Sequence, residues 1–413
     1  DFYVAMLNQL DEALTRRGLP HRVVFLIYVD LLWQPEKEKL HNPGRFVLMF
    51  APITRTYSQS FKPGDDQPTP PPYVRNRLTF PKSASENLAF LKPWQKLAGG
   101  SQGAFGGVQY VSADANGDVD LDKLREVCGE DVAGMMITVP NTLGVFEAHI
   151  KEIVDIIHGC GGLMYMDGAN MNAMMGVAKP ADLGFDVMHY NLHKTFSTPH
   201  GGGGPGAGPV GAAAHLVDYL PDPVVVRDPA PAEGGPVYRF HHPPKTIGRV
   251  RSFWGHFGIL VRAHTYIRML GTPGLRDVAE SAVLNANYLR SRIRDTYPVP
   301  YDRICKHEFV AEGHFPGVPD IGALDIAKRL IDYGVHPPTN YFPLIVHDAL
   351  MIEPTETESL QTLDNYADAL LAIAEEARTD PDLLHEAPHT APVRRLDEVR
   401  AAREPMLRYE HDE

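Results

Sequence analysis

The chain has 413 residues, 44% of them hydrophobic and 22% charged, which is enough material for a sizeable core and more than one domain. The net charge of -13 disfavours nucleic acid as a partner, because phosphate backbones repel an acidic surface. Glycine and proline occur 36 times each but follow no period, which argues against a collagen-like chain. Three unpaired cysteines, Cys128, Cys160 and Cys305, show no disulfide framework and predict a cytoplasmic protein.

The N-terminal region, residues 1–106, lacks the regular pattern of apolar residues found in the rest of the chain. Tyr3–Arg16 is predicted to be an amphipathic helix and Arg22–Leu32 a strand, whereas Phe61–Tyr73 is rich in Pro, Asp and Gln and predicts a loop or linker. We find no signal peptide and no apolar run of about 18 or more residues, so no membrane span is predicted. No function follows from these residues.

From residue 107 the pattern becomes regular. Short apolar runs alternate with segments of helical spacing, and this alternation predicts an α/β domain with a mostly parallel sheet over 107–270. The predicted strands and helices, in chain order, are Val108–Val111, Leu121–Val127 (helix), Val132–Val139, Ile150–Ile157 (helix), Leu163–Met166 and Phe185–Tyr190.

The last part of the chain, 271–413, is predicted to form a smaller α+β domain. A capping box is predicted at Thr355, with Glu358 three residues on, before a final helix. The other predicted elements of this domain are helices at Leu275–Arg294 and Ile321–Tyr333, and strands at Glu308–Ala311, Tyr341–Val346 and Ala349–Ile352. A further helix, predicted at Trp254–Leu270, ends the preceding domain.

Two charged residues follow predicted parallel strands, where functional groups of such sheets gather. Asp167 and Lys194 lie 194 − 167 = 27 residues apart, so one connection could bring them into the same crevice. A desolvated amine is a nucleophile toward carbonyl carbons, and a carboxylate that pairs with a pyridinium nitrogen would complete a pyridoxal phosphate site. The alternative is an ordinary surface ion pair for Lys194 and a loop cap for Asp167.

A glycine-rich segment, His200–Gly211, follows Lys194 and matches G-x-G-x-x-G twice. Pro205 and Pro209 interrupt it and no helix clearly opens after it, so a dinucleotide fingerprint is disfavoured. The segment predicts either a loop that approaches an active site closely or a plain flexible loop.

Other polar residues carry weaker signals. His189 and His193 are four residues apart, but further ligands and an HExxH motif are missing, so no metal site is expected. Arg249 and Arg251 could bind a carboxylate or phosphate, or form a solvated or interface pair.

Several longer segments resemble the glycine decarboxylase P-protein family. They are PNTLGVFE (140–147), YMDGANMNAMMG (165–176), GFDVMHYNLHKTFSTPHGGGGPGAGPVG (184–211), IGRVRSFWGHFG (247–258), and HPPTNYFPLIV with ALMIEPTETES (336–359). The C-terminal sequence is similar to the separate second subunit of two-subunit bacterial forms. The resemblance covers the chain from about residue 107 onward.

The resemblance implies a fold-type I, pyridoxal phosphate-dependent transferase-like architecture. Lys194 would form the Schiff base, and Asp167 would pair with the pyridine nitrogen. The residues implied to lie near the cofactor or substrate are Asn141, Thr142, Ala169, Asn170 and His193.

The implied reaction is decarboxylation of glycine, with transfer of the aminomethyl group to the lipoyl arm of H-protein. The implied partner is the first subunit of the P-protein, in a heterotetramer of two plus two chains. The catalytic residues would be Lys194, Asp167 and His193.

Two alternatives stay open. The family's serine–cysteine motif and its glycine-containing phosphate segment are not found here, and only Ser83–Asn87 stands where a serine–alanine–histidine motif is expected. The chain could instead be another fold-type I enzyme, such as a different amino-acid decarboxylase or a carbon–sulfur lyase. It could also be an inactive scaffold subunit that binds the cofactor poorly.

Overall fold

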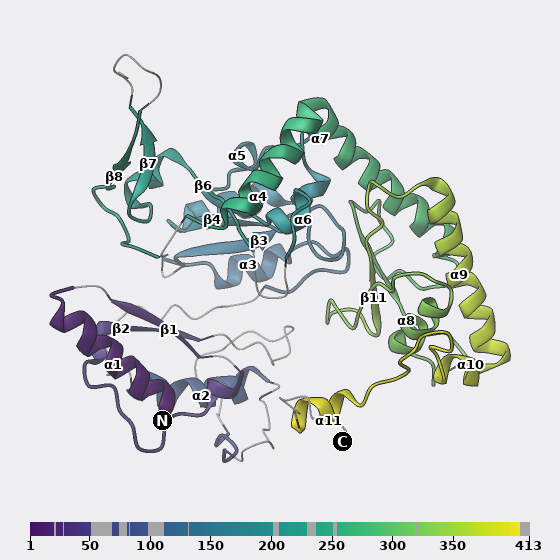
Figure 1. Ribbon diagram of the computed structural model, residues 1–413, viewed down its shortest axis with the longest axis horizontal. Helices are drawn as coiled ribbons and strands as arrows, with labels where there is room; N and C mark the ends of the chain where they lie inside the picture. Colours follow the sequence, from purple (N-terminus) through teal and green to yellow (C-terminus); the bar gives the residue numbers. More distant parts are fainter. Residues whose placement is uncertain are drawn as a thin grey trace, which may run out of the picture. The chain divides into compact units, whose positions relative to one another are not determined.

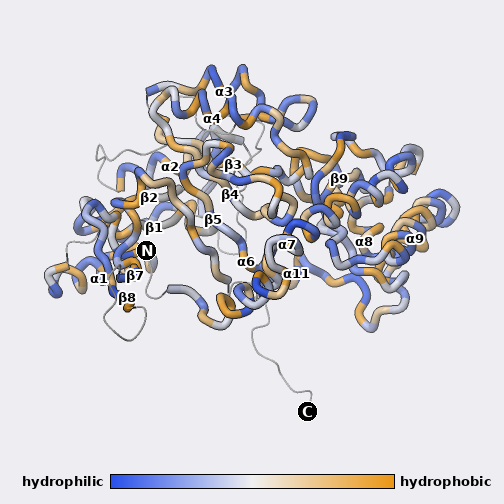
Figure 2. The backbone as a smooth tube through the Cα atoms, turned by 90° about the horizontal axis from the view of Figure 1, so that it is seen from above, coloured by the Kyte–Doolittle hydropathy of each residue, from blue (hydrophilic) through white to orange (hydrophobic). Residues whose placement is uncertain are grey.

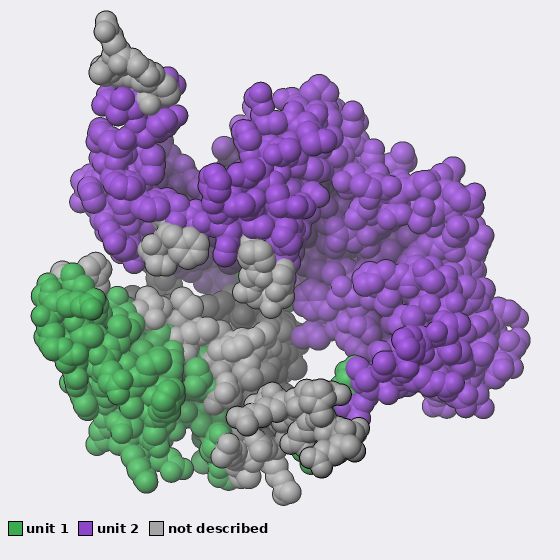
Figure 3. Space-filling view, in the orientation of Figure 1, with its two compact units in different colours: residues 1–112, 398–413 green, residues 113–397 purple. Residues whose placement is uncertain are grey.

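The computed structural model describes residues 1–19, 22–27, 29–50, 68–73, 81, 83–97, 111–130, 132–200, 206–228, 237–250, 254–318 and 320–404. The chain forms two compact units (Figure 3). The first comprises residues 1–112 with 398–413, and the second comprises 113–397. In the described part of the chain, no helix combines the length and apolar character needed to cross a membrane.

The first unit is built on a short parallel strand pair. β1 and β2 pair in register from Val23 opposite Phe46, and their apolar side chains pack with those of the flanking helices. Trp94 is buried in this core and its indole N–H donates to the carbonyl of Leu32 at 2.9 Å. The elements are α1 (Phe2–Arg16), β1 (Val23–Ile27), η1 (Val29–Leu32), η2 (Pro43–Arg45), β2 (Phe46–Phe50), α2 (Ala84–Leu97) and α11 (Glu398–Arg403).

Two predictions for this unit have different outcomes. The helix expected at Tyr3–Arg16 is confirmed as α1. The strand expected at Arg22–Leu32 is too long, because the chain turns into the 3-10 helix η1 after β1. Of the predicted loop at Phe61–Tyr73, residues 61–67 lie outside the described part, and 68–73 contain no helix or strand.

The second unit contains a sheet of order β3-β4-β5-β6, in which β3, β4 and β5 are parallel and β6 is antiparallel. Three of these strands, β3, β4 and β6, are labelled in Figure 1. This order confirms the predicted α/β sheet; of the strand expected at Val108–Val111 only Val111 is described, and it lies in no strand. The elements are α3 (Leu121–Val127), β3 (Gly134–Thr138), α4 (Ile150–Gly159), β4 (Leu163–Gly168), η3 (Met171–Ala173), α5 (Pro180–Leu183), β5 (Val187–Tyr190), α6 (Leu192–Thr195) and β6 (Val210–Ala212).

Helix α4 shows why these residues fold as they do. Ile150, Ile153, Val154 and Ile157 recur at three- and four-residue spacing, so all four lie on one face of the helix, and all four are buried. Gly161 then adopts a left-handed φ of 81°, a conformation that glycine takes without steric cost, and the chain turns into β4.

An antiparallel sheet of order β10-β11-β9 forms the other part of the second unit, with helices packed on it. Hydrophobic and hydrophilic residues alternate along α8 and α9 (Figure 2), as expected for helices that bury one face. The remaining elements are η4 (Ala214–Tyr219), β7 (Val224–Arg227), β8 (Tyr238–His241), α7 (Phe257–Ile293), β9 (Phe309–Glu312), α8 (Ala323–Asp332), β10 (Thr339–Asn340), β11 (Ala349–Ile352), α9 (Leu360–Thr379) and α10 (Pro381–His385).

Helix α7 is broken at Gly271, whose φ of 63° and ψ of -175° are not helical, so the two predicted helices are present as its two halves. The domain boundary predicted at residue 270 falls at this break. The division into 107–270 and 271–413 stays a prediction.

Two local predictions in this region are wrong. The strand expected at Tyr341–Val346 is replaced by the two-residue β10, because Tyr341 has a φ of 60° and Pro343 lacks an N–H for a ladder. The capping box at Thr355 does not form. The last long helix begins at Leu360 instead, and the Ser359 hydroxyl caps it by accepting from the Thr362 N–H at 3.1 Å.

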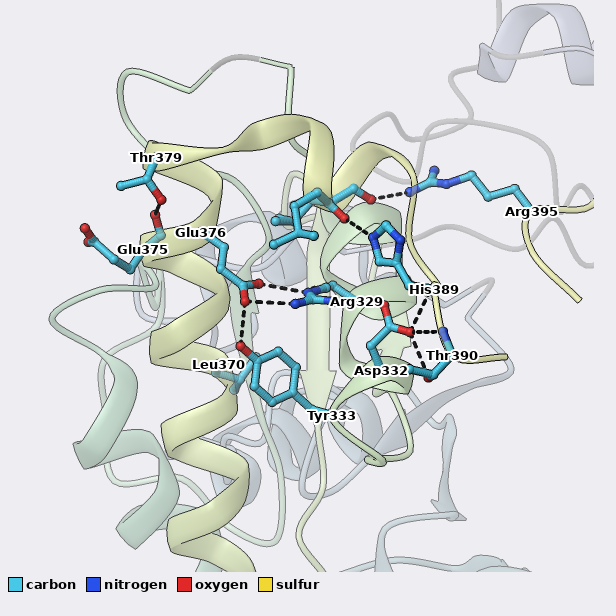
Figure 4. A network of polar contacts seen from close by, with 12 residues as sticks. Arg329, Asp332, Tyr333, Leu370, Glu375, Glu376, Thr379, His389, Thr390 and Arg395 are labelled. Atoms are coloured by element: carbon cyan, nitrogen blue, oxygen red, sulfur yellow. Dashed lines mark hydrogen bonds and ion pairs between the residues drawn. The ribbon is translucent and has the colours of Figure 1, made fainter. Parts of the chain in front are cut away.

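A polar network joins α8 to α9 (Figure 4). The Arg329 guanidinium donates to both carboxylate oxygens of Glu376, each at 2.9 Å, and also to Asp332 at 3.0 Å. Asp332 in turn accepts from the backbone N–H of Thr390 at 2.7 Å. A charge-assisted pair with two parallel hydrogen bonds is both strong and directional. This network therefore sets how the two helices lie against each other.

Candidate active site

The structure places Asp167 and Lys194 at the same edge of the parallel sheet. Asp167 is the next-to-last residue of β4, and Asp167 lies opposite His189 in the β4–β5 register. After β5 ends at Tyr190, the short helix α6 begins, and it carries Lys194. Because β4 and β5 are parallel neighbours, their carboxyl ends meet, as the spacing of 27 residues suggested.

The carboxylate of Asp167 is held by its surroundings. Its Oδ1 accepts the backbone N–H of Ala169 at 2.9 Å and lies 3.2 Å from Nε2 of His189. Nδ1 of His189 lies 2.8 Å from the hydroxyl of Tyr165. If that hydroxyl donates to Nδ1, Nε2 carries the hydrogen and donates it to Asp167.

Tyr165 is therefore expected to stay protonated. Burial raises the pKa of Tyr165, and the negative charge of Asp167 raises it further. The sequence analysis weighed His189 only as a metal ligand and missed its contact with Asp167. Its position on the neighbouring strand, in the register of Asp167, is the signal that could have revealed it.

Several buried polar atoms around Lys194 have no hydrogen-bond partner within the described ranges. They are Nδ1 of His193 and the hydroxyls of Thr195 and Thr198. Burial lowers the pKa of His193, and the charges of His200 and Lys194 lower it further, so its ring is neutral at pH 7. Buried polar groups are normally paired, so these atoms fit a polar ligand such as a phosphate ester.

Asn141 organises the turn that follows β3. Its amide donates to the carbonyl of Gly117 at 2.7 Å and accepts from the backbone N–H groups of Leu143 and Val145 at 3.0 and 3.2 Å. Thr142 is half-buried in the same turn. This amide thus shapes the backbone of the turn, and the cofactor contact implied for Asn141 and Thr142 stays a prediction.

Asn170 links the edge of the parallel sheet to the antiparallel sheet. Its side chain is buried and donates to the carbonyl of Pro140 at 2.9 Å and to Glu308 at 3.2 Å. Asn172 donates in the same way to Glu353 at 3.3 Å. The sequence analysis missed both glutamates, although Glu308 begins a predicted strand and Glu353 directly follows one.

The glycine-rich segment is described from residue 206 on. A Cβ on Gly208 would lie 2.8 Å from the carbonyl of Tyr190, and the N–H of Tyr190 donates to the carbonyl of Pro209 at 3.0 Å. The second half of this loop therefore lies close to the end of β5, while Gly201–Pro205 lies outside the described residues. Its approach to an active site stays a prediction. Arg251 also lies outside them, and Arg249 is exposed.

The comparisons with known proteins agree with this geometry. A family described as the C-terminal domain of glycine dehydrogenase matches residues 278–389, and the aminotransferase class-V family matches 78–203. Over 303 residues the chain is 53% identical to the probable glycine dehydrogenase (decarboxylating) subunit 2 of Alkaliphilus oremlandii, covering 73% of this chain and 61% of that protein. Over about three quarters of its length the chain is thus similar to glycine dehydrogenase subunit 2 proteins.

The protein of the same name from Halalkalibacterium halodurans is 57% identical over 301 residues, or 73% of this chain and 60% of that one. The predicted resemblance to the P-protein family is thus confirmed. The chain spans about three fifths of the length of these curated relatives.

Two solved structures share the fold. An inhibitor-bound glycine decarboxylase (P-protein) of the glycine cleavage system aligns with a TM-score of 0.56 at 20% identity, over 70% of this chain and 63% of that one. A cysteine desulfurase from Thermococcus onnurineus aligns with a TM-score of 0.50 at 18% identity, over 70% of each chain. The chain therefore has the predicted fold-type I architecture.

Proposed function

We propose that this chain is the lysine-bearing subunit of a pyridoxal phosphate-dependent glycine decarboxylase. Its substrate would be glycine, and the aminomethyl group would pass to the lipoyl arm of H-protein. The observation that carries the proposal is the 53–57% identity to subunit 2 proteins across a region that includes a lysine and a carboxylate at one sheet edge.

Bound pyridoxal phosphate would supply a protonated ring that accepts the electrons released when the glycine carboxylate leaves. Lys194 would anchor it through its Nζ. Asp167 would hold a proton on the ring nitrogen, since its carboxylate is itself oriented by His189 and by the N–H of Ala169. The unpartnered hydroxyls of Thr195 and Thr198 suit the phosphate end of such a group.

The neutral ring of His193 would lie beside Lys194 without adding positive charge to it. Its ring packs edge-on to His200 with centroids 4.6 Å apart, which fixes its orientation. We propose His193, Asn141, Thr142, Ala169 and Asn170 as the residues that shape this pocket.

The proposed partners are a first subunit, in an assembly of two plus two chains, and lipoylated H-protein. A first subunit is implied by the name of the relatives, which are second subunits.

The free thiols of Cys128, Cys160 and Cys305 suit a reducing cytoplasm. Cys128 and Cys160, far apart in sequence, interact directly, and burial, helped by this neighbour, raises the pKa of Cys128 to about 11.

The test uses the chain assembled with a first subunit and supplied with pyridoxal phosphate. Borohydride should fix the cofactor on Lys194, as located by peptide mass spectrometry. Label should exchange between bicarbonate and the carboxyl group of glycine when lipoylated H-protein is present. Lys194→Ala should lose both signals, whereas Lys151→Ala, a change of an exposed lysine on α4, should retain them.

Other results would separate the alternatives. Cofactor fixed on Lys194 without glycine exchange, but with sulfur release from cysteine, would indicate a carbon–sulfur lyase. Persistent exchange in Lys194→Ala would contradict the role given to this lysine. A complex that never binds the cofactor would indicate a scaffold subunit.

A further inference from the structure

Two glutamates lie opposite each other at one end of the antiparallel sheet. Phe309 of β9 pairs with Ile352 of β11. Glu308 directly precedes β9 and Glu353 directly follows β11, so these two residues face each other across the two strands. Like charges directly opposite each other on neighbouring strands are destabilising. Within the described ranges neither glutamate forms an ion pair with a lysine or arginine, so a bound cation would remove this repulsion.

His307 completes a compact cluster with the two glutamates. Its Nε2 lies 3.9 Å from Oε1 of Glu308 and 3.9 Å from Oε1 of Glu353. One possible ligand atom from each of the three residues lies within 4.8 Å of the other two. Ligand atoms bonded to one metal ion at about 2.0–2.2 Å lie about 3–4 Å apart, so small rotations of the side chains would bring all three onto one ion. The side chain of Glu353 is 43% exposed and can rotate.

Buried polar atoms at this cluster lack hydrogen-bond partners within the described ranges. His307 is 1% exposed, its Nδ1 has no partner, and its Nε2 is too far from both carboxylates for a hydrogen bond. Asn172 is 9% exposed and faces the cluster, because its Nδ2 donates to Glu353 at 3.3 Å. The Oδ1 of the same amide is buried and also has no partner. Buried polar groups are normally paired, so these atoms indicate a ligand.

The charge state of the cluster also suits a cation. Burial lowers the pKa of His307 to about 3, and the charge of Lys194 lowers it further, so the ring is neutral at pH 7 and has a free lone pair. Burial and the charge of Glu353 raise the pKa of Glu308 to about 8, and the charge of Lys194 does not offset them. Without a cation the Glu308 carboxyl thus keeps its proton at pH 7, and a divalent ion would displace that proton as it binds.

We propose that His307, Glu308 and Glu353 bind a divalent transition-metal ion, with Oδ1 of Asn172 as a fourth ligand. One imidazole with oxygen ligands suits Mn²⁺ or Zn²⁺, whereas Mg²⁺ and Ca²⁺ prefer oxygen ligands alone. The ion would join the start of β9, the end of β11 and the segment that follows β4 at one point. Sequence spacing did not predict this site, because its ligands come from three separate segments. The proposal needs no cofactor and does not rest on the proposed function.

The first test measures Mn²⁺ binding to the full chain by electron paramagnetic resonance, after treatment with a chelator. Mn²⁺ is the probe because it binds thiolates poorly, so the cysteines do not compete for it. Each wild-type chain should bind a single Mn²⁺, and Zn²⁺ should displace it, since Zn²⁺ binds more tightly to a given set of ligands. Glu308→Gln and Glu353→Gln should each weaken binding at least about 100-fold, because groups that only orient a ligand already contribute about 10- to 100-fold.

Glu312→Gln is the matched control. The carboxylate of Glu312 lies 3.5 Å from Nε2 of His314, so this variant removes the acid of a second His–Glu pair, at the other end of β9. Its affinity for Mn²⁺ should equal that of the wild type. Absence of bound Mn²⁺ in the wild-type chain would overturn the proposal, and so would an unchanged affinity in Glu353→Gln. If Glu308→Gln does not fold, Glu353→Gln decides, because its side chain is partly exposed.

A second measurement tests whether the ion binds the folded chain at this cluster. A ligand that binds only the folded state raises its stability. Mn²⁺ at about 100 times its dissociation constant should therefore raise the urea midpoint of the wild type and of Glu312→Gln, and leave that of Glu353→Gln unchanged. An equal rise in Glu353→Gln would place the ion elsewhere on the chain and contradict the proposal.

Discussion

The two sheets of the second unit supply different kinds of residue to the same region. The parallel sheet supplies Asp167 and Lys194, at strand ends where sequence rules direct attention. The antiparallel sheet supplies Glu308 and Glu353, which no motif marks as functional. Asn170 connects them by donating to Glu308. The comparison teaches that strand-end rules find residues on the parallel sheet but miss buried carboxyl groups that a second sheet brings to the same segment.

The largest effect should come from disrupting the contact between Gly144, in the turn after β3, and the backbone of Glu308, just before β9. Gly144→Ala places a Cβ against the carbonyl of Glu308, at a residue whose φ is 78°, so both overlap and backbone strain oppose it. We expect a loss of about 4 kcal/mol in the free energy of unfolding, measured in urea. Bonding of pyridoxal phosphate at Lys194 should weaken with it.

Gly161→Ala is the matched control, because its φ is 81° but nothing lies within 4 Å of the added Cβ. It should lose only about 1 kcal/mol, the cost of left-handed backbone alone. Equal losses in the two variants would mean that the contact with Glu308 does not join the sheets.

A smaller effect should come from a change within the helices of the antiparallel sheet. Arg329→Met removes a charge-assisted pair with Glu376 and a contact with Asp332 while keeping the stem of the side chain. We expect a loss of about 2 kcal/mol in the free energy of unfolding. Arg276→Met, which removes an exposed pair with Glu280, should leave the free energy of unfolding close to the wild-type value.

The pH dependence of this loss has a definite sign. The hydrogen bond from Arg329 is the main cause that lowers the pKa of Glu376 below its ordinary value of 4.5. A lowered carboxyl pKa contributes stability above the unfolded-state value and loses it as the pH falls through the folded-state value. The difference between wild type and Arg329→Met should thus be full above about pH 4.5 and shrink below it. A difference that grows in acid would contradict this.

Local patterns predicted most of the fold because they depend on neighbouring residues. The apolar spacing of Ile150, Ile153 and Val154 sufficed for α4, and the apolar run at Ala349–Ile352 sufficed for β11. The strand expected at Tyr341–Val346 failed because backbone angles override side-chain character there. Such angles follow from packing, which the pattern does not contain.

The site was predictable only in part for a similar reason. Asp167 and Lys194 are 27 residues apart and each follows a predicted strand, so their position at one edge of the sheet could be inferred. Glu308 meets Asn170 across 138 residues, and that contact depends on how the two sheets pack. The resemblance to the P-protein family implied roles for Asn141 and His193 but did not single out Glu308.

The smallest effect is expected from a substitution within the parallel sheet. His189→Asn removes the ring that lies between Asp167 and Tyr165, and a hydrogen bond to a charged group is worth about 2 kcal/mol. The backbone N–H of Ala169 still donates to Asp167, so only part of this free energy should be lost from the interaction of Asp167 with bound cofactor. We therefore expect the rate of glycine exchange to fall about tenfold. The pH profile of cofactor absorbance should shift, while the urea midpoint stays close to that of the exposed control His242→Asn. If the urea midpoint falls and the absorbance profile does not move, His189 supports the sheet and does not orient Asp167.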